Sequence, residues 1–279
     1  MLDRTTWPPA AEPGITPDFQ AFRKQAYRIT GLDLTSYKAP QMQRRLRALL
    51  ARVQITSFAE YARLLEHDAA RRQEFRDYVT INVSEFFRDA ERFGELERHV
   101  LPELLATAGN RGLDVWSAGC SIGAEPYSLA MLLRELGPGR HHAVLGTDID
   151  QTILARAQEG GGYSAADLRN VGAERLQRWF SKQPNGLYRV GPAPRALVTL
   201  RQHDLLMDAY PSGPFDLIAC RNVVIYFTDA AKEHIYAEFV RALRPGGILF
   251  VGGTEAILKP NSLELQVLGP GFYRKGTAP

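Results

Sequence analysis

The most informative stretch of the chain runs from Asp114 to Leu129 and reads DVWSAGCSIGAEPYSL. Its apolar beginning predicts a buried strand over Leu113 to Ala118, and the glycines that follow let the backbone turn sharply and approach a ligand. Pro126 suits the first turn of a helix. The glycine spacing is not GxGxxG, and the GK[ST] of a P-loop is absent, so a dinucleotide or phosphate site is disfavoured.

Two acids near this turn are candidate ligand contacts. Glu125, at the entrance of the predicted helix, would repel a phosphate but would bind a cation such as the ammonium group of S-adenosylmethionine; its alternative role is only to cap the helix. Asp148 follows the next predicted strand, Ala143 to Gly146. An acid there accepts hydrogen bonds from both ribose hydroxyls of an adenosine, although an aspartate in Thr147 to Asp150 can also cap the helix predicted next, Gln151 to Gln158.

Short apolar runs alternate with helical stretches through the C-terminal two thirds of the chain. This alternation predicts an α/β fold, in which a mostly parallel sheet carries helices on both faces. An Asn185-Gly186 turn signal before Leu187 to Val190 indicates a small β insertion. The further predicted strands are Ala196 to Leu200, Phe215 to Ala219 and Ile248 to Val251, with a final pair at Leu265 to Leu268 and Phe272 to Arg274.

Two other segments combine polar and aromatic residues. Asn222 follows the strand Phe215 to Ala219 and should face a pocket at the carboxyl ends of the parallel strands, whereas Phe227 fits simple aromatic packing better. Between Thr80 and Asp89, polar residues alternate with aromatic ones, which suits either a site segment or an interdomain hinge. Its polar members are Asn82, Ser84 and Arg88.

The segment from Thr16 to Thr80 differs from the rest of the chain, because it holds 12 Lys or Arg against 7 Asp or Glu. Apolar residues at helical spacing predict an amphipathic helix there, and Asp18 to Ile29 and Ser57 to Leu65 are expected to be helical too. The apolar positions of this amphipathic helix are Met42, Leu46, Leu49, Leu50 and Val53. We therefore expect a flexible leader at 1–15, a helical domain at 16–80, a linker at 81–110 and an α/β domain at 111–279, whose β insertion spans about 163–203.

Composition narrows the function further. The chain has 279 residues, 45% of them hydrophobic and 23% charged, with a net charge of +3, so it is not basic enough to be read as a nucleic-acid binder. Cys120 and Cys220 have neither CxxC nor Cys/His spacing, which indicates a reducing, cytoplasmic compartment and no metal site. We expect neither an apolar run long enough to span a membrane nor a signal peptide, and we therefore expect no insertion into a membrane.

Six motifs in order resemble the CheR family of chemotaxis receptor methyltransferases. They are Asn82 to Arg88, Ser117 to Ser121, Glu125 to Ser128, Thr147 to Asp150, Cys220 to Val223 and Arg244 to Gly247. The resemblance covers nearly everything after the leader. It implies a Rossmann-like, S-adenosylmethionine-dependent methyltransferase sheet preceded by a small all-helical receptor-recognition domain. It also implies methylation of glutamate side chains on the cytoplasmic helices of chemoreceptors, giving methyl esters and S-adenosylhomocysteine.

The resemblance assigns roles to individual residues. Those implied to hold the cofactor, with the turn glycine added, are Asn82, Ser84, Arg88, Gly119, Glu125, Asp148, Asp204, Leu205, Asn222 and Val223. Asp204 replaces an asparagine of the family pattern but keeps an acceptor near the adenine. Ala124 stands where the family usually has a second glutamate. Arg88 and Tyr226 match residues of the family's active site and are expected to orient the substrate carboxylate. That carboxylate is already ionised near neutral pH, so its attack on the methyl group needs no general base.

Receptor recognition is predicted to rest on the basic helix. Five basic residues and no acid lie between Leu34 and Ala59, namely Lys38, Arg44, Arg45, Arg47 and Arg52. Arg44, Arg45, Arg47 and Arg52 are the expected contacts to acidic receptor helices, although a merely solvated face is the alternative. The compact stretch Phe180 to Tyr188 leaves little loop for a peptide groove, so binding of a receptor's pentapeptide tether is not expected. Two other functions stay open: a non-catalytic S-adenosylmethionine-binding receptor scaffold, and a small-molecule or nucleic-acid methyltransferase.

Overall fold

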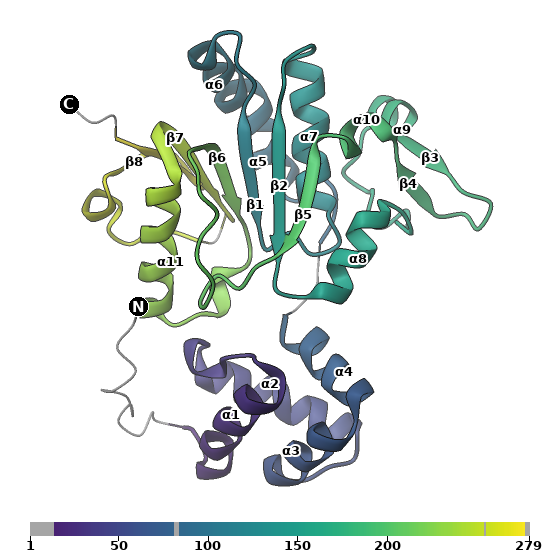
Figure 1. The fold of residues 1–279 in the computed structure, drawn as a ribbon, viewed down its shortest axis with the longest axis vertical. Coiled ribbons are helices and arrows are strands. Elements are labelled where there is room, and N and C mark those ends of the chain that lie inside the picture. The colour runs from purple at the N-terminus through teal and green to yellow at the C-terminus, as the bar shows by residue number, and fades with distance from the viewer. Residues whose placement is uncertain (1–13, 81–83, 254, 277–279) are drawn as a thin grey trace. The chain divides into compact units, whose positions relative to one another are not determined.

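The computed structural model describes residues 14–80, 84–253 and 255–276, and the chain forms two compact units (Figure 1). The first unit comprises Met1–Ile81 together with the short segment Tyr226–Asp229, and the second comprises Asn82–Ile225 and Ala230–Pro279. The predicted leader lies almost wholly outside the described residues, as does Asn82. The return of 226–229 to the first unit was not expected from the sequence.

Helices make up the N-terminal unit, as predicted. They are α1 (Pro17–Thr30), the 3₁₀ turn η1 (Leu34–Ser36), α2 (Ala39–Arg52), α3 (Phe58–His67) and α4 (Ala69–Thr80). The Ser57 hydroxyl caps α3 by accepting a hydrogen bond from the Glu60 N–H at 3.2 Å. An aromatic core holds the unit together, with Phe22 packed 5.1 Å from Phe58 and 6.0 Å from Phe75 between ring centres. The helix α4 was not predicted, because only Phe75 and Val79 of its residues are buried.

A seven-stranded sheet forms the frame of the second unit. Its strands are β1 (Asp114–Ala118), β2 (Ala143–Asp148), β5 (Val198–Gln202), β6 (Phe215–Cys220), β7 (Leu243–Val251), β8 (Leu265–Gly269) and β9 (Phe272–Lys275). Their order is β5-β2-β1-β6-β7-β9-β8. The first five strands of this order are mutually parallel, whereas β9 runs antiparallel to both of its neighbours. This arrangement confirms the predicted mostly parallel sheet and its final strand pair.

Successive residues of β1 serve the two faces of the sheet, because side chains alternate along a strand. Val115 belongs to the apolar cluster that includes the helix α7 (Ala124–Leu136). Trp116 points to the opposite face, where its ring lies 5.2 Å from that of Phe239 in α11 (Asp229–Ala242). The helix α8 (Gln151–Glu159) follows β2. Helices thus cover both faces of the sheet, as the α/β reading requires.

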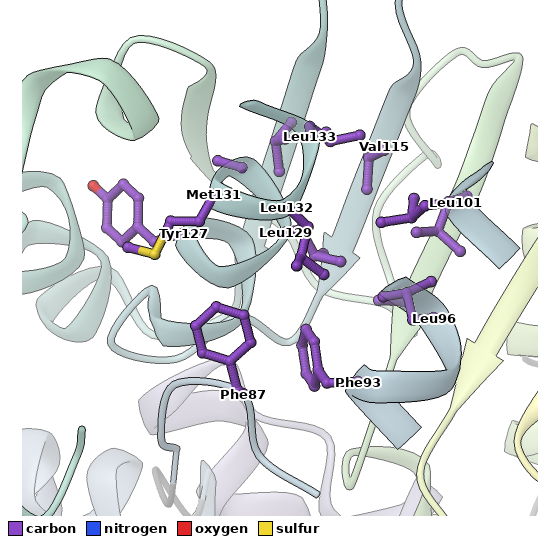
Figure 2. Close-up of a cluster of buried hydrophobic side chains, with 14 of the residues drawn as sticks. Phe87, Phe93, Leu96, Leu101, Val115, Tyr127, Leu129, Met131, Leu132 and Leu133 are labelled. Atoms are coloured by element: carbon purple, nitrogen blue, oxygen red, sulfur yellow. The ribbon is translucent and has the colours of Figure 1, made fainter. Parts of the chain in front are cut away.

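Much of the described part, 84–110, of the stretch expected to be a linker is instead packed into the core of the second unit. From Ala90 it forms α5 (Ala90–Glu95), the π-helical turn η2 (Leu96–Val100) and α6 (Leu101–Ala108). Figure 2 shows Phe93, Leu96 and Leu101 lying among the side chains of α7 and β1. These residues bury apolar surface that an exposed linker would leave in water, so the linker prediction was wrong for this part of the chain.

The β insertion is smaller than predicted. It consists of α9 (Ala173–Trp179), the antiparallel hairpin of β3 (Phe180–Lys182) and β4 (Tyr188–Val190), and the short helix α10 (Pro192–Arg195). The next strand, β5, pairs with β2 in the main sheet, so the insertion ends before Val198 rather than near residue 203. The remaining elements are the 3₁₀ turns η3 (Val224–Tyr226) and η4 (Pro260–Leu263).

Candidate active site

The carboxyl ends of β1, β2, β5 and β6 meet at one edge of the sheet. The N–H groups of Gly119 and Cys120, just after β1, both donate to the carbonyl of Thr147 in β2 at 2.8 Å. On the other side of β2, the His203 N–H donates to the Asp148 carbonyl at 2.9 Å. Parallel α/β sheets bind ligands at this edge. The backbone pairing therefore gathers the loops that follow β1, β2 and β5.

The turn after β1 is tight and depends on glycine. Gly119 has a φ of +82°, and a Cβ built there would lie 2.4 Å from Cγ2 of Val223. Glycine is thus required both by the backbone conformation and by the close approach of the loop after β6. Ser121 and Gly123 also have positive φ angles, of 48° and 84°. The turn holds Gly119 and Val223, two predicted cofactor contacts, against each other.

Asp148 binds the backbone of the glycine turn. Its Oδ2 accepts a hydrogen bond from the Ser121 N–H at 2.7 Å, and its Oδ1 accepts one from the Asp150 N–H at 3.1 Å. Asp150 is the residue that caps α8, through the N–H groups of Thr152 and Ile153. Burial raises the pKa of Asp148, and the two backbone N–H groups oppose that rise. Capping of α8 therefore belongs to Asp150, whereas Asp148 is buried and supports the glycine turn.

Glu125 lies on the first turn of α7 but does not cap it. Its Oε1 accepts a hydrogen bond from the Ser117 hydroxyl at 2.8 Å, and its Oε2 lies 3.5 Å from the Arg221 guanidinium. The side chain is 13% exposed. Burial raises the pKa of Glu125, while the nearby Arg221 lowers it. A largely desolvated carboxylate of this kind favours a cationic ligand group.

Arg221, which the sequence analysis did not single out, connects several parts of the site. Its side chain is 2% exposed, with the guanidinium carbon 5.1 Å from the ring centre of Phe93 and 4.6 Å from that of Phe250. It donates to the carbonyl of Arg88 at 2.8 Å and also approaches Glu125. The contacts of Arg221 join residues that are far apart in the sequence and follow no periodic pattern. This role of Arg221 is therefore visible only in the folded structure.

The segment 84–88 is anchored by its aromatic residues. The Phe87 N–H donates to the Ser128 hydroxyl of α7 at 3.0 Å, and Figure 2 shows the Phe87 ring beside that of Phe93, 5.4 Å away between centres. Phe86 packs edge-on against Tyr163 at 4.8 Å. Ser84 and Arg88 remain partly exposed on this anchored segment. The described residues of this segment are therefore packed into the second unit and do not form a loose hinge.

Asn222 occupies a strained backbone position directly after β6. Its φ is +60°, a left-handed conformation that asparagine tolerates better than most residues. The Asn222 N–H donates to Oε2 of Glu255 at 2.6 Å. Glu255 was not predicted as a site residue, because it lies 33 positions from Asn222 and outside every motif.

The predicted contacts after β5, Asp204 and Leu205, lie in a locally hydrogen-bonded turn. The Asp204 Oδ1 accepts a hydrogen bond from the Leu206 N–H at 2.8 Å, which closes a local turn. Leu205 is 8% exposed, and its carbonyl accepts a hydrogen bond from the Tyr210 hydroxyl. Both residues follow the strand that pairs with β2, so the fold keeps them next to Asp148 in the strand order.

Tyr226 is the predicted site residue that the fold assigns to the helical unit. Its carbonyl accepts a hydrogen bond from the Lys38 N–H at 2.9 Å, and Phe227 forms a β-bridge with Tyr37. The Tyr37 and Phe227 rings pack edge-on, 4.8 Å apart, which confirms the packing role favoured for Phe227. Each unit is thus internally defined, with Arg88 in one and Tyr226 in the other.

The basic helix α2 is only partly as expected. Arg44, Arg47 and Arg52 are exposed, whereas Arg45 is half-buried. Arg45 donates to the Tyr78 carbonyl at 2.6 Å and receives a hydrogen bond at its own carbonyl from the Tyr78 hydroxyl. The Arg45 guanidinium therefore already has a structural partner within the helical unit, which the sequence did not indicate.

The ends of the parallel strands fit S-adenosylmethionine. Asp148 and the largely buried Glu125 place two carboxylates at these strand ends, where one could accept hydrogen bonds from ribose hydroxyls and the other could pair with an ammonium group. The Ser121 hydroxyl is buried next to Asp148 and has no hydrogen-bond partner in the described chain, which leaves a polar atom for a ligand to satisfy. The acidic character of these groups disfavours a phosphate in the same place.

Comparison with known proteins places the chain in a class and then in a family. Residues 82–269 match the model described as the CheR methyltransferase S-adenosylmethionine-binding domain, so the protein is an S-adenosylmethionine-dependent methyltransferase. Residues 17–80 match the CheR methyltransferase all-alpha domain. The chain belongs to the CheR methyltransferase family.

Its curated relatives share nearly their whole length with it. A chemotaxis protein methyltransferase of Listeria monocytogenes is 41% identical over 263 residues, which are 94% of this chain and 99% of the relative. Chemotaxis protein methyltransferase 1 of Pseudomonas aeruginosa is 36% identical over 92% of this chain and 97% of its own. The Escherichia coli chemotaxis protein methyltransferase is 36% identical over 85% and 83%.

Proposed function

We propose that the protein transfers the methyl group of S-adenosylmethionine to glutamate side chains on the cytoplasmic helices of chemoreceptors, giving methyl esters and S-adenosylhomocysteine. The observation that carries this proposal is the pairing, in one chain, of an acidic cofactor site at Glu125 and Asp148 with an exposed basic helix face on α2. The names of the relatives, chemotaxis protein methyltransferases, support the same substrate class.

The chemistry asks little of the protein beyond positioning. Bound S-adenosylmethionine supplies an electrophilic methyl group attached to a sulfonium. A substrate glutamate has an ordinary pKa of about 4.3, so it enters as a carboxylate and needs no base. Holding the two reactants in line and excluding water therefore carry most of the rate enhancement.

Arg88 and Tyr226 are the proposed orienting residues for the substrate carboxylate. An arginine makes charge-assisted hydrogen bonds to a carboxylate, and a tyrosine hydroxyl adds a neutral one. The Arg88 carbonyl accepts a hydrogen bond from the Arg221 side chain and the Tyr226 carbonyl accepts one from the Lys38 N–H, so the backbone of each residue is anchored within its own unit. Too tight an arginine pair would stabilise the ground state, so we assign orientation rather than activation.

Asn82, Ser84, Gly119, Asp204, Leu205, Asn222 and Val223 complete the proposed cofactor contacts. The proximity of Gly119 to Val223 and the pairing of β5 with β2 support their place around Glu125 and Asp148.

Recognition of the receptor is proposed to use Arg44, Arg47 and Arg52, with Arg45 contributing through the part of its side chain that is not buried. Glutamate-rich receptor helices carry the complementary charge, which speeds association and sets the register. We also propose that no pentapeptide tether binds to the β insertion. The compact turn between β3 and β4 supports this, since the Gly186 N–H donates to the Gln183 carbonyl and the Gln183 N–H to the Leu187 carbonyl.

Because the proposed substrate is the set of cytoplasmic helices of chemoreceptors, we also propose a cytoplasmic location for the protein. None of the described helices combines the length and the apolar character that crossing a membrane requires.

The deciding experiment transfers a labelled methyl group from S-adenosylmethionine to a purified receptor cytoplasmic fragment. A carboxyl methyl ester loses its label in mild base, so base-labile label on the receptor fragment is the expected result. Binding of S-adenosylhomocysteine without any transfer would favour the non-catalytic scaffold, and base-stable label would favour a small-molecule or nucleic-acid methyltransferase. In the same samples, a receptor-derived pentapeptide should give no heat in calorimetry.

A further inference from the structure

Glu255 is a buried carboxylate just beyond β7 that none of the motifs includes. Its residue is 6% exposed, and its Oε2 accepts hydrogen bonds from two backbone groups, the N–H of Asn222 at 2.6 Å and the N–H of Gly252 at 2.7 Å. Its own N–H donates to the Gly252 carbonyl at 2.8 Å. A charged acceptor shared by two backbone donors is a strong tie between the ends of β6 and β7.

Gly252 is what lets these two loops come together. A Cβ at this position would lie 2.4 Å from the Glu255 carboxylate and 3.2 Å from the Asn222 nitrogen. Any other residue would push the carboxylate away from Asn222. Gly252 and the Glu255 carboxylate therefore act together to hold the Asn222 backbone.

The left-handed backbone conformation of Asn222 needs stabilising contacts, because residues other than glycine intrinsically prefer negative φ angles. A non-glycine residue at a φ of +60° persists only where its surroundings stabilise it. The conformation matters to the site, since the next residue, Val223, is the one packed against the glycine turn at Gly119. The preceding residue, Arg221, reaches the Arg88 carbonyl and Glu125.

Electrostatic interactions connect Glu255 with the backbone of Asn222 and with Arg221. Burial raises the pKa of Glu255, and the N–H groups of Asn222 and Gly252 and the Arg221 guanidinium lower it. One carboxylate therefore faces the backbone of Asn222 and the charge of its neighbour, so its loss would disturb both.

We propose that Glu255 is a positioning residue for cofactor binding, which acts by locking the left-handed turn at Asn222 and so places Val223 and Arg221 against the rest of the site. This role concerns the cofactor alone and does not depend on which molecule accepts the methyl group. Its failure is therefore distinguishable from failure of the proposed receptor methylation.

The test measures the dissociation constant for S-adenosylhomocysteine by calorimetry in wild type, Glu255→Gln, Glu255→Asp and Glu255→Ala. The glutamine amide oxygen can accept the same two N–H groups, so its dissociation constant should stay within about threefold of wild type. The alanine variant leaves both N–H groups unpaired and should bind at least about tenfold more weakly, a loss that corresponds to about 1.4 kcal/mol. The aspartate side chain is one methylene too short to keep both bonds, so an intermediate value is expected.

A purely structural role would give a different pattern. It would lower the melting temperature and the fraction of chains that bind, while the folded fraction kept the wild-type dissociation constant. Asp68→Ala is the matched control, because Asp68 also accepts hydrogen bonds from two backbone N–H groups, those of Ala70 and Arg71, but belongs to the helical unit. This control should leave the dissociation constant unchanged. Normal affinity of Glu255→Ala at full stoichiometry would overturn the proposal; if that variant does not fold, normal affinity of Glu255→Asp would do so.

Discussion

The guanidinium carbon of Arg45 lies 6.0 Å from the ring centre of Tyr226 and 5.1 Å from that of Tyr78. Arg45 comes from the basic helix α2, whereas Tyr226 is the last residue of the 3₁₀ turn η3, which follows β6. Both belong to the helical unit, so the domain proposed to recognise the receptor also holds the tyrosine proposed to orient the substrate. Arg45 thus lies beside both Tyr78, which belongs to the helix α4, and the candidate site residue Tyr226.

This geometry separates Arg45 from its exposed neighbours. Arg45→Ala removes a charged hydrogen bond to the Tyr78 carbonyl and should destabilise the helical unit by about 1 to 3 kcal/mol. Arg52→Ala, at an exposed position on the same helix, should change stability by less than about 0.5 kcal/mol. Denaturant unfolding of the two variants checks this difference, and equal stability losses would contradict the assigned role of Arg45.

The exposed arginines should act on the receptor instead. Charge reversal at Arg47 and Arg52 together is expected to raise the KM for a receptor fragment and to leave the affinity for S-adenosylhomocysteine unchanged. Wild-type methylation should also slow as salt is added, because charges at the surface are screened over about 10 Å at 0.1 M. Initial rates over a salt series measure both effects. A solvated face without a partner would instead show a salt-independent rate and a normal KM in the double variant.

Asp148 and Asp150 are neighbours in sequence with separable roles. Asp148→Ala should weaken S-adenosylmethionine binding by about 1.5 to 3 kcal/mol, the range for losing a charged acceptor. Asp150→Ala removes the cap of α8 and should mainly lower stability, by about 1 kcal/mol. Calorimetry and thermal melting of both variants distinguish the two roles, and an unchanged affinity in Asp148→Ala would refute the ribose assignment.

Glu125 makes cofactor binding depend on pH. Burial raises its pKa above the value in the unfolded chain, so the ligand-free folded state favours the protonated carboxyl. That contribution to stability is present below the ordinary glutamate pKa and is lost as the pH rises through the raised value. An ammonium ligand requires the ionised form, so affinity for S-adenosylhomocysteine should fall as the pH falls through the same value.

Comparing wild type with Glu125→Gln isolates this group from Asp148, whose pKa burial also raises. The glutamine variant should bind more weakly near neutral pH and show a shallower pH dependence of the dissociation constant. Without ligand, it should melt above wild type near neutral pH, by a margin that narrows as the pH falls. Parallel pH profiles for the two proteins would show that Glu125 is not the group that titrates.

Local patterns in the sequence were enough to predict most strands and five of the helices, namely α1, α2, α3, α7 and α8. The alternation of short apolar runs with helical stretches predicted the parallel sheet, and the helical spacing from Met42 to Val53 predicted α2. These signals work because strand and helix periodicity depend on which residues are buried within a few positions of each other. The motifs likewise pointed to Glu125 and Asp148 as candidates, since each lies at the end or the beginning of an element that the pattern predicts.

Contacts between distant positions could not be read in this way. The burial of Arg221 between Phe93 and Phe250, the tie from Glu255 to Asn222 and the packing of Tyr226 on the helical unit each join residues that share no motif or period. The stretch 84–110 and the helix α4 escaped prediction for a related reason, since their burial depends on partners elsewhere in the chain. The sequence by itself therefore supplied the candidate site residues through local motifs. Only the tertiary structure decided how those residues are held in place, because side-chain pairing between distant positions is set by packing and loop geometry.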